Sequence, residues 1–330
     1  MYTEHEVSEL MLNDNQLRHL DKEGYLVVED VINPVTVLNP LVKEYESVLD
    51  NLALELYSKG EIKELHEDLT FSERLTQIYM DSGKVHPQYF DFSLPQQGIK
   101  YDTPMWHGPA VFNVLTCPEL LKVVESVIGS EIYSNPVQHN RFKPPEKYSP
   151  RNPDGSIQLG ATAWHQDNGV VNEDADETDM LTVWIPVWDA SEVNGCLHLV
   201  PKSHKEGLNV HCPAGGTVAI PNELFRVEDA ISVPMKRGSI LLMHRLTCHG
   251  SLPNKSDRIR WSLDLRYNPI GQSSGRLAFP GFNAKSQSNP ESVLQNPAIW
   301  DSMWKEARKS LAAKENPNYN RWSSDNPACA

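Results

Sequence analysis

The sequence predicts a mainly β protein with helices before and after a β core of the sandwich, barrel or jelly-roll kind. Two observations support this prediction. Apolar residues recur at three- and four-residue spacings before residue 130 and near the C-terminus, which is typical of helices that bury one face. Between about residues 130 and 270, short β-rich runs alternate with Pro, Gly and Asn. Many short strands separated by turn residues are typical of these β folds.

The N-terminal third carries the clearest helical pattern. One apolar stripe runs from Leu41 to Leu56 and predicts a helix of several turns. A second pattern begins after Pro118 and stops at Gly129, residue types that commonly open and close helices. Residues 298–314 return to a helical composition. We therefore expect helices on both sides of the β core.

Short β-rich runs between turn residues predict the strands. They lie at residues 25–32, 132–139, 162–167, 180–189, 196–201, 239–244 and 258–268. No repeat, low-complexity tract or Gly/Ser linker divides the chain, so we expect a single domain over residues 1–330. Its expected parts are a mainly helical region (1–130), a β core (131–270) and a C-terminal extension with a helix (271–330).

Composition excludes several classes of function. The chain has 30 basic and 44 acidic residues and a formal net charge of −14, which argues against binding a phosphate backbone. It has no run of 18 apolar residues, and its first twenty residues lack the apolar stretch of a signal peptide. The five cysteines are scattered without a CxxC pair, so we expect reduced thiols rather than disulfides. We expect a soluble cytoplasmic protein with a small-molecule substrate and with no nucleic-acid or membrane partner.

The most informative segment is Ala-Trp-His-Gln-Asp at residues 163–167. In an extended chain His165 and Asp167 point to the same side, where an imidazole and a carboxylate can bind one metal ion. His249, after the apolar run 239–244, is the candidate for a third ligand. Two histidines and one carboxylate form the facial triad of non-haem Fe(II) oxygenases. Because an H-x-D triplet can occur by chance, a further signal is needed.

Residues 258–266 (RIRWSLDLR) supply that signal, because they alternate strictly between polar and apolar side chains. The polar face fits either a solvated sheet surface or the inside of a polar cavity. In a cavity, an arginine can bind the far carboxylate of a dicarboxylic acid through two parallel hydrogen bonds. Arg260 lies eleven residues after His249, a separation that suits a turn and one strand returning past the metal.

With these motifs the sequence resembles the phytanoyl-CoA dioxygenase family, a branch of the Fe(II)/2-oxoglutarate-dependent oxygenases. The resemblance runs from residue 21 to about residue 268. It rests on the ordered motifs His165-Gln166-Asp167, Trp184, Asn194-Gly195-Cys196-Leu197, Val200-Pro201-Lys202-Ser203-His204-Lys205, and His249-Gly250-Ser251 with Arg260. It implies a double-stranded β-helix, the cupin-like jelly roll, with flanking helices. It also implies a dioxygenase that consumes 2-oxoglutarate and O2, releases succinate and CO2, and hydroxylates a C–H bond.

The resemblance implies a role for each matching residue. His165, Asp167 and His249 match the catalytic Fe(II) ligands, and Arg260 matches the arginine that binds the distal carboxylate of 2-oxoglutarate. Halogenases of this superfamily carry a small residue in place of the carboxylate ligand. The presence of Asp167 therefore argues against halogenation, whereas desaturation, epoxidation and ring closure stay open.

Further cosubstrate contacts follow from the same resemblance. Ser251 matches a hydroxyl that helps to bind the distal carboxylate, and Trp184 matches a residue that lines the cosubstrate pocket. His139 aligns with another cosubstrate contact. Lys143 lies on the same face as His139 if that segment is extended, so it could serve instead.

The substrate is less constrained than the chemistry, and we expect a small metabolite or natural-product intermediate. Residues 173–179 hold five carboxylates and could form a lid for a cationic substrate, although a solvated loop is the commoner case. Asp264 and Arg266 could contact a polar or zwitterionic substrate, or could pair with each other.

Two other functions have to be weighed against an oxygenase. One is a jelly-roll enzyme with another metal, such as a cupin-like isomerase or a zinc hydrolase; the other is a binding protein without catalysis. A hydrolase has no need of a cosubstrate arginine such as Arg260, and a complete ligand set argues against lost catalysis.

Overall fold

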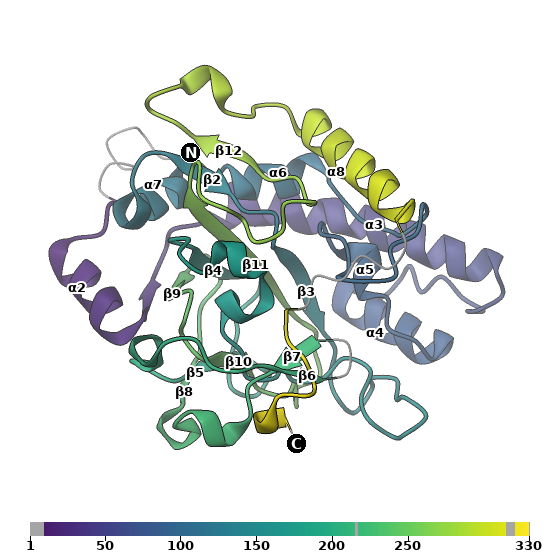
Figure 1. Ribbon diagram of the computed structural model, residues 1–330. Coiled ribbons are helices and arrows are strands. Elements are labelled where there is room, and N and C mark those ends of the chain that lie inside the picture. The colour runs from purple at the N-terminus through teal and green to yellow at the C-terminus, as the bar shows by residue number, and fades with distance from the viewer. Residues whose placement is uncertain (1–9, 215–216, 315–320, 330) are drawn as a thin grey trace.

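The computed structural model describes residues 10–214, 217–314 and 321–329, and its core is a pair of antiparallel sheets (Figure 1). The larger sheet has the order β1-β9-β4-β11-β2-β12, with β3 also paired to β11, and the smaller one has the order β10-β5-β8. A separate hairpin joins β6 and β7. The strands are β1 (Tyr25–Val28), β2 (Ile132–Ser134), β3 (His139–Lys143), β4 (Leu181–Pro186), β5 (Leu197–Leu199), β6 (Cys212–Ala214), β7 (Thr217–Ala219), β8 (Ile231–Val233), β9 (Ile240–His244), β10 (His249–Ser251), β11 (Arg260–Pro269) and β12 (Phe282–Lys285).

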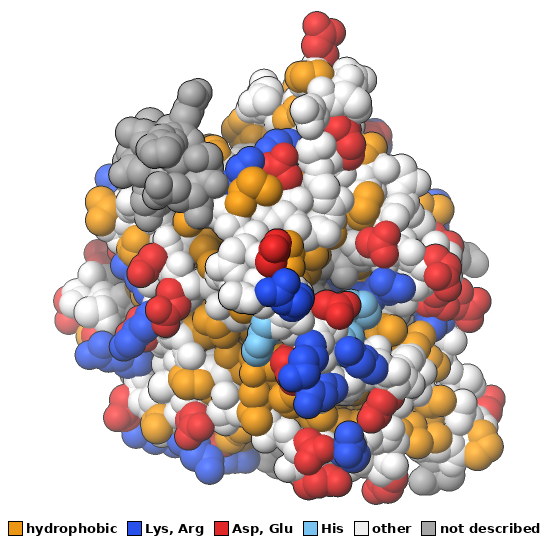
Figure 2. Space-filling view, turned by 90° about the vertical axis from the view of Figure 1, so that its left-hand side faces the viewer, with side chains coloured by type: hydrophobic (Ala, Val, Ile, Leu, Met, Phe, Trp, Pro, Cys, Tyr) orange, Lys and Arg blue, Asp and Glu red, His pale blue; other side chains and the backbone are white. Residues whose placement is uncertain are grey.

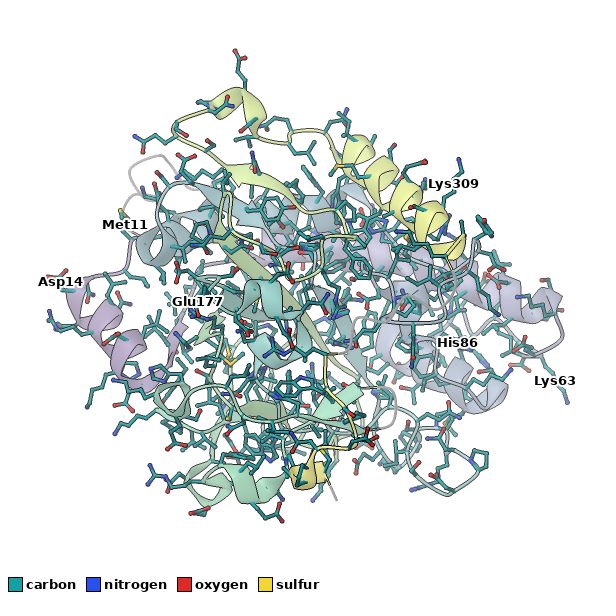
Figure 3. The ribbon with its side chains drawn as sticks, viewed as in Figure 1. Met11, Asp14, Lys63, His86, Glu177 and Lys309 are labelled. Atoms are coloured by element: carbon teal, nitrogen blue, oxygen red, sulfur yellow. A yellow bond between two sulfur atoms is a disulfide. The ribbon has the colours of Figure 1, made fainter. Side chains whose placement is uncertain are left out.

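Helices cover one face of the larger sheet, as the sequence predicts. The predicted stripe from Leu41 to Leu56 lies in α3, and the helix after Pro118 ends at Gly129, which has a φ of +86°. Figure 3 places Asp14 of α2 at one end of the molecule and Lys63, after α3, at the other. The helices are α2 (Asp14–Glu23), α3 (Asn39–Ser58), α4 (Phe71–Ser82), α5 (Pro87–Phe90), α6 (Pro109–Leu115), α7 (Pro118–Ile128) and α8 (Pro297–Ala312).

The alternation along β11 separates an apolar face from a polar one. Trp261, Leu263 and Leu265 belong to one hydrophobic cluster with the inner faces of the helices. Arg260 and Arg266, on the opposite face, are buried and line a cavity. The polar face of this strand therefore faces a cavity inside the fold, one of the two alternatives that the sequence leaves open.

A second hydrophobic cluster joins the two sheets. It contains Trp184 of β4, Leu241 of β9 and Leu199 of β5, together with side chains from β8. Sheets that pack face to face bury the alternate side chains that point inward. This packing of two antiparallel sheets, with helices over one of them, confirms the predicted jelly-roll architecture with flanking helices.

Two predicted strands differ from the structure at turn residues. The run 25–32 ends as a strand at Val28, because Asp30 has a φ of +54° that breaks the extended chain. The run 132–139 is divided into β2 and β3 by Pro136, which has no N–H to donate to a ladder.

The predicted strand at 162–167 is wrong. This segment forms only an isolated bridge between His165 and His249, and the chain then turns into a short 3-10 helix, Asp167–Val170. The prediction used the strand to place His165 and Asp167 on one face, whereas the bridge joins His165 to His249. It brings the two parts of the candidate metal site together.

The expectation of reduced cysteines is also wrong for one pair. Cys212 and Cys329 form a disulfide, with Cα atoms 5.4 Å apart and a sequence separation of 117. Cys117, Cys196 and Cys248 are free and buried. The spacing of the cysteines gives no sign of this pair, because only the folded chain brings the C-terminus beside β6.

The described residues contain no helix that is long and apolar enough to cross a membrane. Figure 2 shows the side of the molecule that carries α2. Acidic side chains surround the basic ones there, and the basic side chains gather near the middle with apolar side chains between them.

Candidate metal centre and cosubstrate pocket

His165, Asp167 and His249 meet at the cavity between the two sheets. One possible ligand atom from each lies within 4.8 Å of the others. Two backbone hydrogen bonds of 2.9 Å, one in each direction, join His165 to His249. Their ring centroids are consequently 4.2 Å apart, so two segments distant in sequence present their imidazoles side by side.

Both imidazoles are oriented by backbone carbonyls. Nδ1 of His165 donates to the carbonyl of Ala163 at 2.9 Å, and Nδ1 of His249 donates to the carbonyl of Thr247 at 2.9 Å. Because each Nδ1 carries the ring proton, each Nε2 has the free lone pair that can bind a metal ion. Burial, together with the nearby His249, lowers the pKa of His165 to about 3. His165 is therefore neutral at physiological pH, as a metal ligand must be.

Asp167 is held as a buried anion. Arg266 donates to its Oδ1 and Thr182 donates to its Oδ2. Burial on its own works to raise the pKa of Asp167, but Arg266 and the two imidazoles outweigh it and hold that pKa below its usual range. Two imidazole nitrogens and one carboxylate form a donor set that fits a divalent first-row metal.

The cavity beside this triad has a volume of about 340 Å³ and contains two buried basic side chains from neighbouring strands. Lys143 of β3 lies opposite Arg260 of β11 in the register of the sheet. The side chains of both are 3% exposed. Burial and the neighbouring Arg260 lower the pKa of Lys143 to about 6, and burial lowers the pKa of Arg260 to about 10.

Lys143 and Arg260 donate only to neutral groups of the described residues. Nζ of Lys143 donates to Oγ of Ser251 at 2.5 Å and to the carbonyl of Leu252 at 2.6 Å. Arg260 donates to the hydroxyl of Ser262, while its buried Nε has no hydrogen-bond partner. Buried charges are normally paired with opposite charges, so the pocket is electrostatically incomplete without an anion.

The other predicted cosubstrate contacts also line or adjoin this cavity. Trp184 lines it, and its ring centroid lies 5.6 Å from the guanidinium carbon of Arg260. Ser251 is buried, and its Oγ accepts a second hydrogen bond, from the backbone N–H of Thr162 at 2.9 Å. His139 lines the cavity too, with its Nδ1 bonded to Oδ2 of Asp91 at 2.8 Å.

Asp264 and Arg266 both line the cavity but do not pair with each other. Arg266 bonds to Asp167, and Asp264 accepts from Nε of Arg141 at 3.3 Å. The sequence did not reveal the Arg266–Asp167 pair. Alternation placed Arg266 on the same face as Arg260, but the partner depends on how β11 lies against the chain near residue 167.

The acidic segment 173–179 is tied to the loop after β11 and to the C-terminus. Asp174 accepts from Ser273 at 2.5 Å, and Arg321 donates to Asp176 at 2.6 Å. Figure 3 labels Glu177 in this segment. None of the described residues 173–179 lines the cavity.

Comparison with known proteins now identifies the family. The sequence profile of the phytanoyl-CoA dioxygenase family matches residues 20–262. This chain belongs to that family. A 1-deoxypentalenic acid 11-beta-hydroxylase of Streptomyces arenae is 30% identical over 228 residues, which cover 66% of this chain and 67% of the relative. A phytanoyl-CoA dioxygenase domain-containing protein 1 of Bos taurus is 23% identical over 267 residues, covering 76% and 87% of the two chains.

Solved structures share the fold at lower sequence identity. The non-haem monooxygenase ThoJ in its apo form matches with a TM-score of 0.54 at 16% identity, covering 90% of this chain and 98% of the other. EctD from S. alaskensis, with 2-oxoglutarate and 5-hydroxyectoine, matches with a TM-score of 0.51 at 17% identity, covering 82% and 80%. The family assignment and the triad confirm the predicted class, an Fe(II)/2-oxoglutarate-dependent dioxygenase.

Arg266→Met should weaken metal binding about 10- to 100-fold, the usual effect of removing a group that orients a ligand. The reason is that Asp167 loses its positive partner and its orientation. Calorimetric titration with Co(II) under anaerobic conditions measures the change. Arg141→Met is the matched control, because Arg141 lines the same cavity but pairs with Asp264. Equal Co(II) affinities for wild type and Arg266→Met would contradict this account of the site.

Proposed function

We propose that this dioxygenase hydroxylates a C–H bond of a small molecule, with 2-oxoglutarate and O2 as cosubstrates and with release of succinate and CO2. His165, Asp167 and His249 bind Fe(II), and Arg260 binds the distal carboxylate of 2-oxoglutarate with help from Lys143. One observation carries the proposal: the two histidines of the triad line the same cavity as two buried basic side chains that donate only to neutral groups.

The donor set supports iron in particular. When bound, the iron supplies the activation of O2 that couples decarboxylation of 2-oxoglutarate to attack on an unactivated C–H bond. The three residues would hold the metal through two imidazoles and one carboxylate, the donor set typical of non-haem Fe(II) oxygenases. The hydrogen bonds to Ala163 and Thr247 fix both Nε2 atoms toward the same point. Arg266 and Thr182 hold both oxygens of the carboxylate ligand.

Arg260 and Lys143, in its charged form, are suited to a bound dicarboxylate. In a buried site they attract an anion more strongly than they would in water, and the fork of Arg260 can contact both oxygens of a carboxylate. Oγ of Ser251 already accepts from Lys143 and from Thr162, so its own proton is left to donate to that carboxylate. Nδ1 of His139 is hydrogen-bonded to Asp91. The Nε2 atom of His139 is therefore the one left for the proposed contact with the cosubstrate.

We propose a small, polar substrate. The cavity of about 340 Å³ is at the lower end of the range for ligand pockets and also has to hold 2-oxoglutarate. Its polar wall includes His139, Arg141 and Asp264, and Oδ1 of Asp264 is buried without a hydrogen-bond partner. Hydroxylation is supported by the name of the Streptomyces arenae relative. Small metabolites should therefore raise succinate formation more than bulky polycyclic acids do, and the reverse order would contradict this substrate class.

The proposal extends to the organisation and location of the chain. One hydrophobic cluster includes side chains from Leu12 to Leu311, which supports a single catalytic domain over residues 1–330. The location that we propose is the cytoplasm. Fractionation of cells that make the protein tests this location, and recovery in an extracytoplasmic fraction would contradict it.

The enzyme should convert 2-oxoglutarate to succinate slowly even without substrate. This turnover should depend on the metal ligands and on Arg260. His165→Ala and Asp167→Ala remove a metal ligand and should abolish succinate formation. Arg260→Ala should chiefly raise the 2-oxoglutarate concentration needed for half-maximal rate, because the metal ligands stay in place. Succinate measured by mass spectrometry provides the readout. Full activity of either triad variant would contradict the proposal.

Binding of 2-oxoglutarate should take up close to one proton at pH 7.5. Lys143, with a pKa of about 6 beside Arg260, is mostly neutral at that pH, and a bound carboxylate favours its charged form. Below pH 6 the lysine is already charged, so uptake disappears there. Above pH 6, the affinity for 2-oxoglutarate should fall by up to tenfold per pH unit, until the pH reaches the pKa of Lys143 in the complex with 2-oxoglutarate. Calorimetry in buffers of different ionisation enthalpy measures the protons.

Lys143→Arg is the matched control for this prediction, because it keeps a positive charge at every pH in the range. It should bind 2-oxoglutarate without proton uptake and with a flat pH profile between pH 6 and 8. Equal proton uptake by wild type and Lys143→Arg would show that another group titrates.

A further inference from the structure

We propose that the Cys212–Cys329 disulfide is a redox-sensitive site that holds the C-terminal strap, residues 321–329, against the metal loop, residues 165–170. Reduction to two thiols frees the strap and loosens the metal site. The strap and its bridge are features of the structure itself, whereas the consequence for metal binding rests on the proposed function.

The strap contacts the metal loop directly through Trp322. Its Nε1 donates to the carbonyl of Gly169 at 2.6 Å, two residues after Asp167. Next to it, Arg321 donates to Asp176 at 2.6 Å, on the segment that follows the metal loop. The strap is therefore bonded to the stretch of chain that contains the carboxylate ligand.

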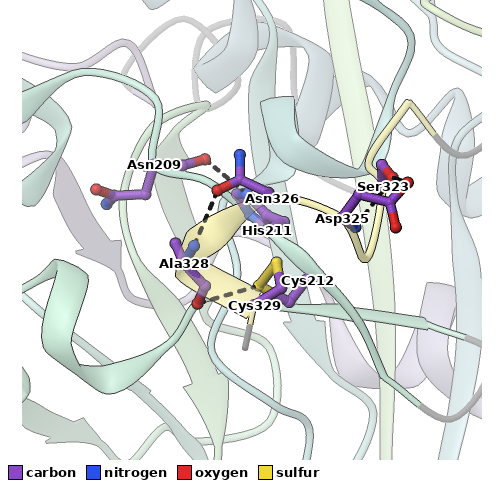
Figure 4. Close-up of a disulfide and its surroundings, with 8 residues drawn as sticks. All are labelled: Asn209, His211, Cys212, Ser323, Asp325, Asn326, Ala328 and Cys329. Carbon is purple, nitrogen blue, oxygen red and sulfur yellow. Dashed lines mark hydrogen bonds between the residues drawn. A yellow bond between two sulfur atoms is a disulfide. The ribbon is translucent and has the colours of Figure 1, made fainter.

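A second path runs through His211, which adjoins the disulfide (Figure 4). The ring of Trp322 stacks on the buried His211 ring, with centroids 5.1 Å apart and an interplanar angle of 26°. Nδ1 of His211 donates to the carbonyl of Asn209, so Nε2 accepts from the backbone N–H of Gln166 at 2.9 Å. His211 thus lies between the strap and the residue that separates the two metal ligands of the loop.

The metal loop packs so closely against the His211 ring that neither can move independently of the other. A Cβ at Gly169 would lie 2.1 Å from Cε1 of the His211 ring, so this position accepts only glycine unless the ring moves. The side chain of Gln166 is also fixed, with Nε2 donating to the carbonyls of Gly207 and Leu246 at 2.8 and 2.7 Å. Displacement of His211 would therefore shift the backbone that carries the metal ligands.

The other half of the disulfide belongs to a wall of the cavity. Cys212 is the first residue of β6, and the β6–β7 hairpin contributes Ala214, Thr217 and Val218 to the cavity lining. Figure 1 shows the C-terminus beside this hairpin. The bridge therefore connects the strap to a wall of the cavity as well as to the metal loop. A cross-link between residues so far apart in sequence restricts the chain strongly once it is formed.

This bridge is the cysteine pair that a reductant can reach. Cys212 and Cys329 are half-buried, whereas the three free cysteines are buried. Burial raises the pKa of Cys117 to about 12 and that of Cys248 to about 11, so these thiols are poorly reactive. In reducing compartments, a disulfide is usually transient and redox-sensing.

The exchange reaction balances with a dithiol reductant. A thiolate of the reductant attacks one sulfur of the Cys212–Cys329 bridge, and the other cysteine leaves as a thiolate that takes up a proton. The second thiol of the reductant then attacks the mixed disulfide and releases the first cysteine. Two electrons and two protons pass to the protein, and the reductant becomes a disulfide.

Hydrogen–deuterium exchange and Co(II) titration of the full chain test the proposal. Protein prepared without thiols should show no reactive cysteine with Ellman's reagent under native conditions. Treatment with dithiothreitol, followed by desalting, should expose two. Reduction should raise the exchange rate of the backbone amides of residues 166–170 at least fivefold and the Co(II) dissociation constant about tenfold.

Two variants separate the bridge from general effects of the reductant. Cys329→Ser should resemble the reduced wild type whether or not dithiothreitol is added, and oxidation should restore only the wild type. Trp322→Phe keeps an aromatic ring over His211 but loses the bond to Gly169, so it should raise exchange at residues 166–170 in the oxidised protein.

Three results would overturn the proposal. They are two reactive thiols after mild oxidation, equal exchange at residues 166–170 in both redox forms, and equal Co(II) affinity in both forms. If neither form binds Co(II), the proposed function fails instead, and the exchange rates still decide whether the strap holds the metal loop.

Discussion

The burial of positive charge on one face of β11 is the constraint on which the site depends. Arg260 and Arg266 are almost fully buried, and a buried charge is costly unless a partner offsets its lost hydration. Arg266 finds its partner in Asp167. Arg260, with Lys143 beside it, donates only to neutral groups, and in the proposed function the dianion 2-oxoglutarate is its partner. The same strand therefore pairs with Asp167 at one position and carries the proposed cosubstrate contact at another.

The opposite face of β11 explains why these charges stay in place. Trp261 stacks parallel to Phe71, with centroids 5.5 Å apart, and its Nε1 donates to Asn140 at 2.5 Å. Leu263 and Leu265 pack in the same helix-covered cluster. The packed apolar face fixes the backbone of β11. This rigid backbone in turn holds the charged side chains on the cavity face in position.

The sequence predicted much of this arrangement because alternation is a local property. The period-two pattern at residues 258–266 identified both faces of β11, and the family resemblance brought His165, Asp167 and His249 together. What it missed depends on contacts between distant segments. The Arg266–Asp167 pair, the Lys143–Ser251 bond and the Cys212–Cys329 bridge each join residues about a hundred positions apart. Such contacts are set by sheet register and by the path of the C-terminus.

The strand prediction at residues 162–167 shows how a correct site can follow from an incorrect element. The inference needed His165 and Asp167 on one side of the chain, and their possible ligand atoms do lie within 4.8 Å of each other without a strand. After the bridge between His165 and His249 the chain turns into a short 3-10 helix, so the metal loop has few backbone hydrogen bonds to neighbouring strands. Contacts from His211 and the C-terminal strap supply additional support, which links the metal site to the redox state of the protein.

The most direct test of the central claim is an anaerobic absorption spectrum of the protein with Fe(II), recorded before and after 2-oxoglutarate is added. If the triad, Arg260 and Lys143 form one site, a weak visible charge-transfer band should appear only when both Fe(II) and 2-oxoglutarate are present. His249→Ala should not give the band, and Arg260→Ala should need more 2-oxoglutarate to reach it. Absence of the band from folded wild-type protein at saturating concentrations would contradict the account.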